Sequence, residues 1–450
     1  MKIKKLIICI LATALSATLL TACGGGTDSS SGTNSSSASS SSSESSVSES
    51  SAEDSDSSES SEESKESSDE SDSEESESSE SESKTESSET EKSSDNASNP
   101  AIELVKDMKV GWNLGNSLDS VGADETAWGN PKVTENFIKS VKDAGFNTVR
   151  IPVTYLNHTG DAPDYKIEEA WLDRVGEVVN YVLDNDMYAI INIHHDGMNS
   201  GDAWLTPAPE DENVMMDKYE KMWTQIADYF KDYSDKLVFE GMNELHKGYD
   251  TPEESYYEIT NKLNQKFVDI VRASGGNNAE RFLSVPGYNT NVEYTVNKLT
   301  LPKDTVENHI IVTAHFYDPY TFALEAKTKQ WGKFATETVD DWGQEDWTEK
   351  AFDMLKEKFV DNGIPVLISE FGCTGGIAED YRAYYDEYVV KTAHQRGLTC
   401  ILWDNGSDGD GAEAFGHFDR NTGTVLHQKV IDGIMRGAET AEDYEVTFPQ

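Results

Sequence analysis

The chain has 450 residues, 84 acidic against 37 basic side chains, a formal net charge of −47 and four cysteines. A surface this acidic repels phosphate backbones and anionic lipid, which argues against nucleic-acid binding and against electrostatic docking on a membrane. Four cysteines are too few to staple a fold of this length with disulfides. The charge is uneven: residues 1–23, 24–99 and 100–450 carry formal charges of +3, −19 and −31.

Residues 1–22 are interpreted as a signal peptide. Three lysines precede an apolar run from Leu6 to Leu20, about 15 residues long, which is short for a membrane span of about 20. The segment ends in LTACG, which resembles a bacterial lipoprotein processing box and implies cleavage before Cys23 and lipid on its thiol. We therefore expect a cell-surface protein anchored to the membrane only through Cys23. An ordinary signal and a fully secreted protein are the alternative.

Residues 23–99 contain the lipidated cysteine and a low-complexity linker. From Gly24 to Asn99 there are 36 serines, 22 acidic residues and no aromatic residue. Such a segment cannot bury enough apolar surface to offset the entropy of ordering its backbone. We expect a disordered, solvated Ser/Asp/Glu-rich spacer whose like charges keep it extended.

From residue 100 onward, short apolar runs alternate with amphipathic stretches. The predicted strands are 108–114, 148–153, 188–194, 237–243, 282–287, 310–316, 365–370 and 398–403. The predicted helices are 133–144, 171–185, 216–233, 255–273, a short one at 291–299, 347–362, 380–396 and 425–436. Most of the strands are apolar almost throughout, which is typical of a parallel sheet covered on both faces. The pattern predicts an α/β fold, a closed (β/α)8 TIM barrel over 100–450.

Polar residues gather at the carboxyl ends of the predicted strands, where (β/α)8 barrels carry their chemistry. They are Asn113, Asn116, Arg150, His194, His195, Asp196, Asn243, Glu244, His315, Tyr317, Glu370, Trp403, Asp404 and Asn405. Glu244 and Glu370 follow the fourth strand and end the seventh, which face each other across the barrel mouth. A carboxylate beside a packed core is costly unless it has a partner or a function, so these two predict a working pair.

Seven motifs, in chain order, resemble glycoside hydrolase family 5. They are GWNLGNSLD at 111–119, VRIPV at 149–153, IHHD at 193–196, NEL at 243–245, HFY at 315–317, SEFG at 369–372 and WDNG at 403–406. The run HFYDPY at 315–320 further resembles the subfamily rich in endoglucanases, lichenases and xyloglucanases. The resemblance implies a retaining endo-β-1,4-glucanase for cellulose, mixed-linkage β-glucan or xyloglucan. A β-mannanase or xylanase and a catalytically inactive surface glycan-binding protein are the alternatives.

The resemblance also implies roles for individual residues. Glu244 would be the general acid/base and Glu370 the nucleophile of a double displacement, with the two carboxyls about 5–5.5 Å apart. We expect Glu244 to have the higher pKa, because it must arrive protonated. The implied supporting residues are Arg150 and Tyr317 on Glu370, Asn243 on the sugar 2-hydroxyl, and His194 and His315 beside the sugar or the glutamates.

Contacts to the polysaccharide are expected from Asn116, His195, Trp403, Asn405, Trp204 and Trp128. Trp403 would be a stacking floor for a sugar ring, and the loop tryptophans would line an open cleft. Trp331 and Trp342 lie in the stretch 318–346, where no clear element is predicted. Loops of this length in a domain are usually functional, although we expect about half of the loop tryptophans to pack their own loops.

The pair His194-His195, followed by Asp196, is open to interpretation as a metal site. Consecutive strand residues point to opposite faces, so both histidines enter the barrel only if the strand has already ended. No third ligand at helical spacing accompanies them. We therefore expect no metal, no cofactor, a β-glucan polysaccharide as the partner, and a monomer.

Overall fold

The computed structural model describes residues 99–197, 203–439 and 443–449. The predicted signal peptide, Cys23 and the serine-rich linker lie outside these residues, so these expectations stay predictions. Among the described residues, no helix combines the length and the apolar character needed to cross a bilayer.

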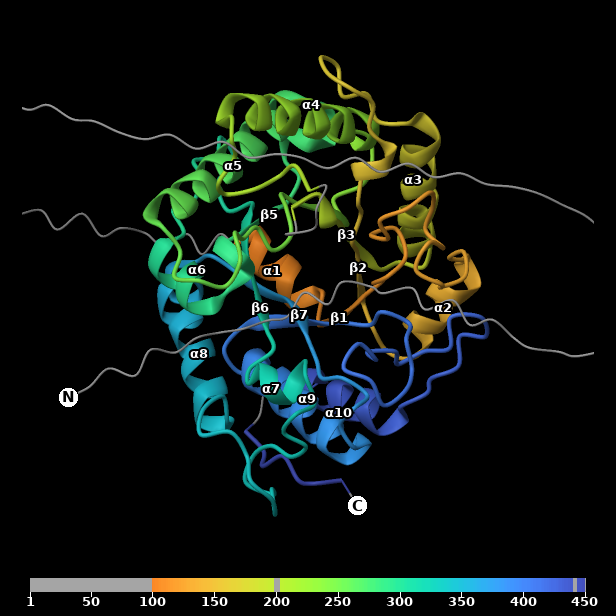
Figure 1. The fold of residues 1–450 in the computed structure, drawn as a ribbon, viewed down its shortest axis with the longest axis vertical. Coiled ribbons are helices and arrows are strands. Elements are labelled where there is room, and N and C mark those ends of the chain that lie inside the picture. Colours follow the sequence, from red (N-terminus) through yellow and green to blue (C-terminus); the bar gives the residue numbers. More distant parts are fainter. Residues whose placement is uncertain (1–98, 198–202, 440–442, 450) are drawn as a thin grey trace, which may run out of the picture. The chain divides into compact units, whose positions relative to one another are not determined.

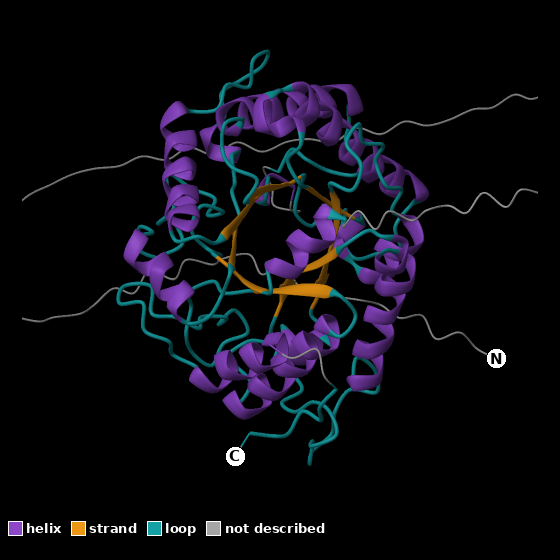
Figure 2. Cartoon of the chain, turned by 180° about the vertical axis from the view of Figure 1, so that it is seen from behind, coloured by secondary structure: helices purple, strands orange, loops and turns teal. Residues whose placement is uncertain are grey.

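Eight parallel strands form a closed barrel in chain order, with the first strand pairing with the last. They are β1 (Val110–Asn113), β2 (Thr148–Ile151), β3 (Tyr188–Ile191), β4 (Leu237–Glu240), β5 (Leu283–Pro286), β6 (Ile310–Phe316), β7 (Val366–Phe371) and β8 (Leu398–Leu402). Figure 2 shows the strands as a ring surrounded by helices. The predicted (β/α)8 barrel is confirmed, and all eight predicted strands are present.

The predicted helices are also present. They are α2 (Glu135–Asp143), α3 (Glu169–Asp184), α4 (Glu212–Phe230), α5 (Glu254–Ala273), α6 (Val292–Lys298), α8 (Glu345–Lys358), α9 (Glu379–His394) and α10 (Gln428–Glu439). Several begin before the predicted residue, because their first residue is a glutamate, which carries no apolar signal. Helix α4, for example, begins after Asp211, whose side chain accepts the N–H groups of Asn213 and Val214.

Two helices escaped prediction. Helix α1 (Pro100–Asp107) places Leu104, Val105 and the following Met108 against the inward apolar side chains of the strands, which form a second core cluster. In Figure 1 it is seen across the middle of the ring of strands, whose inward side chains it contacts. Helix α7 (Tyr320–Ala323) interrupts the stretch 318–346, in which no element was predicted. Four residues are too short for a recognisable period of 3.6.

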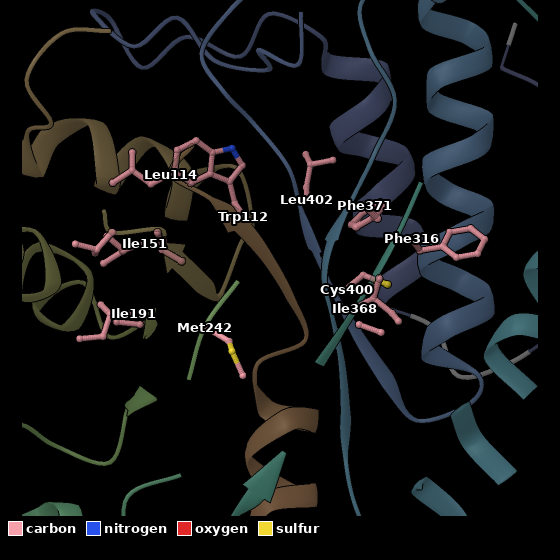
Figure 3. Packing of buried hydrophobic residues seen from close by; sticks show 14 of the residues in the cluster. Trp112, Leu114, Ile151, Ile191, Met242, Phe316, Ile368, Phe371, Cys400 and Leu402 are labelled. Atoms are coloured by element: carbon pink, nitrogen blue, oxygen red, sulfur yellow. The ribbon is translucent and has the colours of Figure 1, made fainter. Parts of the chain in front are cut away.

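The main core lies between the barrel and its helices. Trp112 on β1 points to α2, where its ring meets Phe137 at a centroid distance of 5.7 Å. Figure 3 shows Trp112 together with Ile151 and Phe316 in this cluster. Trp331 is fully buried and packs on Tyr385, so this loop tryptophan belongs to the core.

An extra residue in β7 sets the direction of the chain at the barrel mouth. Ala314 of β6 pairs with Ile368, but the next residue, His315, pairs with Glu370, so Ser369 is bulged out of the register. Nδ2 of Asn113 donates to the carbonyl of Ser369 at 2.9 Å and so satisfies the disrupted backbone. Bulges re-aim side chains beside active sites, and this one sets Glu370 level with His315.

Candidate active site

Arg150 on β2 lies at the centre of the strand-end residues and has no exposed surface. Its Nη1 donates to Asn113 at 3.0 Å and to Glu370 at 2.6 Å, and its Nη2 donates to Asn243 at 2.8 Å. Its Nε and Nη2 contact Glu240 at 2.8 and 2.7 Å. Arg150 therefore donates four hydrogen bonds and makes a further ion-pair contact through Nη2. Burial disfavours the cation, but the attraction of Glu240 and Glu370 outweighs it and raises the pKa of Arg150.

Glu370 is held at both carboxylate oxygens. It is 6% exposed; Oε1 accepts from Arg150, and Oε2 accepts from the hydroxyl of Tyr317 at 3.1 Å. Burial and the charge of Glu370 raise the pKa of Tyr317 well above its usual range, so Tyr317 keeps its proton and donates. The carboxylate is thereby fixed in one orientation.

Glu244 follows β4 and is the more accessible of the two carboxylates, with 25% of its side chain exposed. Its Oε1 lies 2.6 Å from Nδ1 of His315, which in turn lies 3.6 Å from Oε2 of Glu370. Single atoms of these three side chains all lie within 4.8 Å of one another. This separation suits direct attack by one carboxylate, whereas an inverting hydrolase needs about 6.5–9.5 Å to place a water between its two carboxyls.

The surroundings of the two glutamates shift their pKa values in opposite directions. Burial raises the pKa of Glu244, but the hydrogen bond and charge of His315 lower it further, to a net value below the usual range. Burial raises the pKa of Glu370, and His315 and Arg150 only partly oppose it, so the net shift is upward. The expectation of a high pKa for Glu244 did not include the contact with His315, which acts in the opposite direction.

The two adjacent histidines share one side of the barrel mouth. Strand β3 ends at Ile191, before His194 and His195, and their rings meet at a centroid distance of 4.5 Å. The argument that neighbouring side chains diverge therefore does not apply to them. Together with Asp119 they bring three possible metal ligands within 4.8 Å of one another.

Asn192 determines how His194 behaves. Its Oδ1 accepts the N–H of Val153 at 3.2 Å, so its NH2 group must donate to its other neighbours. These are Glu240 at 2.8 Å and Nδ1 of His194 at 3.1 Å. Since Nδ1 accepts, the proton of the neutral ring is on Nε2, which then donates and cannot bind a metal. Burial also lowers the pKa of His194 well below its usual range, which keeps the ring neutral.

Four rings form a continuous row at the mouth of the barrel. Centroid distances are 5.1 Å from Trp128 to His195, 4.5 Å from His195 to His194, and 6.1 Å from His194 to Trp403. Trp128 is 37% exposed. Gly115 makes room for Trp403, since a Cβ there would lie 2.8 Å from the indole ring. The structure thus brings together three of the six residues expected to contact substrate.

The other three are used differently. Asn405 is buried, and its side-chain amide binds the backbone of Ser407, Glu413 and Phe415. It orders the loop after β8, and its expected contact with the sugar stays a prediction. Nε1 of Trp204 donates to Asp196, and the ammonium of Lys218 covers one face of the ring at 4.4 Å. The backbone of Asn116, a partly exposed residue with φ of 52°, is held by Asp119 and Asn130.

A pocket beside the glutamates contains residues that the sequence analysis missed. Glu244, His315 and Tyr317 line it together with three partly exposed tyrosines, Tyr249, Tyr294 and Tyr320. Burial and the charge of Glu244 raise the pKa of Tyr249 to about 12. Tyr320 lies four residues past the end of β6, and Tyr249 lies nine residues past the end of β4. A search extended into the loops after the strands would have found both. Tyr294 is on α6 and gave no such signal.

Comparisons with known proteins agree on one family. A family model described as "Cellulase (glycosyl hydrolase family 5)" matches residues 112–409. The chain is 41% identical over 370 residues to Endoglucanase A of Paenibacillus barcinonensis, covering 77% of this chain and 92% of that protein. A solved family 5 xyloglucanase from Paenibacillus pabuli superposes with a TM-score of 0.72 at 42% identity, covering 75% of this chain and all of that one. A broad-specificity endoglucanase from Bacteroides salanitronis gives a TM-score of 0.71 at 43% identity, covering 76% and 96%.

Proposed function

Because this chain belongs to glycosyl hydrolase family 5, we propose that it is a retaining endo-β-1,4-glucanase, with Glu244 as acid/base and Glu370 as nucleophile. The resemblance carried by the seven motifs is thereby confirmed at the level of the family. The observation that supports the residue roles is the asymmetry of the carboxylate pair. Glu370 is buried and fixed at both oxygens, whereas Glu244 is partly exposed and hydrogen-bonds through Oε1 with His315 and Thr290.

In the first step, Glu370 attacks the anomeric carbon while protonated Glu244 delivers its proton to the leaving glycosidic oxygen. Arg150 and Tyr317 aim the attacking carboxylate. Oδ1 of Asn243 is occupied by Arg150, which leaves the NH2 group of the amide to donate to the sugar 2-hydroxyl. In the second step Glu244 takes a proton from a water whose oxygen attacks the anomeric carbon. The bond between that carbon and Glu370 breaks, and the sugar leaves with its original configuration.

The proposed substrates are cellulose, mixed-linkage β-glucan and xyloglucan. The aromatic row of Trp128, His195, His194 and Trp403 and the tyrosine-lined pocket beside Glu244 offer flat apolar surfaces suited to the CH faces of pyranose rings. The names of the similar proteins, an endoglucanase, a xyloglucanase and a broad-specificity endoglucanase, agree with this range.

Hydrolysis of carboxymethyl cellulose, lichenan, xyloglucan and mannan by the purified protein tests the proposal. We expect activity on the three β-glucans, a rapid loss of viscosity relative to the reducing ends released, and a product with the β-configuration by NMR. Glu370→Gln keeps the shape of the side chain but should lower kcat on the order of 10⁴-fold. Undiminished activity of this variant would falsify the nucleophile assignment. A mannan- or xylan-only profile would favour the alternative enzymes, and binding without hydrolysis would favour a glycan-binding protein.

We propose further that the enzyme is a monomer, exported and tethered to the cell surface through lipid on Cys23. The support is the lysine-rich start, the 6–20 apolar run and the LTACG box, followed by the acidic serine-rich segment. In this arrangement the linker at 24–99 is a solvated spacer that carries the barrel away from the membrane.

A further inference from the structure

Glu240 is a second carboxylate on the guanidinium of Arg150. It ends β4 and is 1% exposed. Its Oε2 accepts from Nε of Arg150 and Nδ2 of Asn192, both at 2.8 Å, whereas Oε1 is buried without a hydrogen-bond partner. A buried carboxylate is costly to desolvate, so the cation of Arg150 is what keeps Glu240 in place. The converse also holds, because Arg150 has no other anion than Glu240 and Glu370 among its described hydrogen-bond partners.

The charges around Glu370 indicate what Glu240 contributes. The charged or titratable groups that face Glu370 are Arg150 from β2, Glu244 after β4, and His315 and Tyr317 from β6 and the residue after it. An unbalanced cation in contact with a carboxylate lowers its pKa by about one to three units. A carboxylate of lower basicity is also a weaker nucleophile. Since Glu240 lies 2.7 Å from the same guanidinium, it cancels the charge that Glu370 would otherwise meet alone.

We propose that Glu240 is a positioning residue whose charge balances Arg150, so that Arg150 orients Glu370 by hydrogen bonding without weakening it as a nucleophile. The inference rests on the proposed function, in which Glu370 attacks the sugar. The same carboxylate anchors the NH2 group of Asn192 and, through it, the tautomer of His194. Glu240 therefore links the two polar walls of the site.

Glu240→Gln tests the charge with little change in shape. The new amide oxygen can replace Oε2 and accept the same two donors, and the new NH2 group takes the place of Oε1, which has no hydrogen-bond partner. The substrate is 2,4-dinitrophenyl β-cellobioside, whose leaving group needs no protonation, so the acid limb of kcat/KM reports the ionisation of Glu370. In Glu240→Gln we expect this limb to move at least about one pH unit lower. The plateau value of kcat/KM should fall about tenfold.

Two further variants separate charge from structure. Glu240→Asp keeps the charge and should keep the acid limb of the wild type even where kcat falls. Asp304→Asn removes a carboxylate from the similarly buried ion pair with Arg272, outside the site. This control should lower the midpoint of thermal unfolding and leave the acid limb unchanged.

An acid limb of Glu240→Gln that coincides with that of the wild type overturns the proposal. A downward shift of the acid limb by about one pH unit in Glu240→Asp also overturns it. This second outcome can be measured even if Glu240→Gln does not fold. Failure of the proposed function looks different, because Glu370→Gln would then still cleave the aryl cellobioside. The charge-balancing role is supported when Glu370→Gln is inactive, the acid limb of Glu240→Gln moves downward and the acid limb of Glu240→Asp does not move.

Discussion

At the scale of single residues, the site depends on hydrogen bonds that hold each charged group in one orientation. Arg150 donates four hydrogen bonds to Glu240, Asn113, Glu370 and Asn243, and Asn192 divides its NH2 group between Glu240 and His194. His315 lies between the two catalytic candidates, with Nδ1 at 2.6 Å from Glu244 and 3.6 Å from Glu370. It is therefore the side chain that most directly sets the protonation of the acid/base.

Replacing His315 by alanine should shift the alkaline limb of activity. The contact with His315 lowers the pKa of Glu244 against the effect of burial, so its loss raises that pKa. Glu244 must be protonated for the first step, and activity is lost as pH rises through its pKa. The alkaline limb of kcat/KM on lichenan should therefore move up by about one pH unit while kcat falls. An alkaline limb that moves to lower pH contradicts this prediction. The control substrate is 2,4-dinitrophenyl β-cellobioside, whose leaving group needs no acid.

At the scale of elements, two local features give the barrel its working shape. The bulge at Ser369 sets Glu370 beside His315, and without it every later side chain of β7 would face the other way. Helix α1 covers inward apolar side chains of the strands, among them Ile190, Val238 and Ile401. Its first turn is capped by Asn99, whose side chain also donates to the carbonyl of Gly363 at 2.7 Å.

Asn99→Ala should destabilise the barrel by about 1–2 kcal/mol, because the N–H groups of Ala101 and Ile102 lose their acceptor. Urea unfolding followed by circular dichroism measures the change. Asn99→Asp keeps the acceptor and loses only the donations to Gly363 and Asn308, so it should cost less than the alanine variant. Equal losses in the two variants would show that the cap contributes nothing and that the link to Gly363 accounts for the effect.

At the scale of the whole molecule, the net charge of −47 divides among parts with different roles. The acidic linker accounts for −19, and its proposed role is to extend and solvate the tether. The barrel domain carries −31, although its proposed substrate is a neutral polymer. Recognition of that polymer would then depend on aromatic surfaces and hydroxyl hydrogen bonds and not on charge.

The tether predicts where the enzyme is found. In a bacterial host with lipoprotein processing, the native chain should remain with the membrane fraction and incorporate labelled palmitate. Cys23→Ser should lose the label and most of the membrane-associated activity, while the specific activity of purified protein stays the same. Equal membrane association of both chains would contradict the lipid anchor and favour a retained helix or another attachment.

The barrel fold, the polar residues at the strand ends and the pair of glutamates can all be predicted from the sequence. Apolar runs buried on both faces and polar residues at their ends are local patterns, and the carboxyl ends of parallel strands must meet. The hydrogen bonds and ion pairs among these residues follow only from the folded barrel, because the partners are far apart in the chain. Glu240 meets Arg150 across 90 positions and His315 meets Glu244 across 71. The second contact lowers the pKa of Glu244, and the first points to the balancing carboxylate. The hold of Asn405 on its loop could not be predicted, because a strand-end position does not specify where a side chain finds its partners.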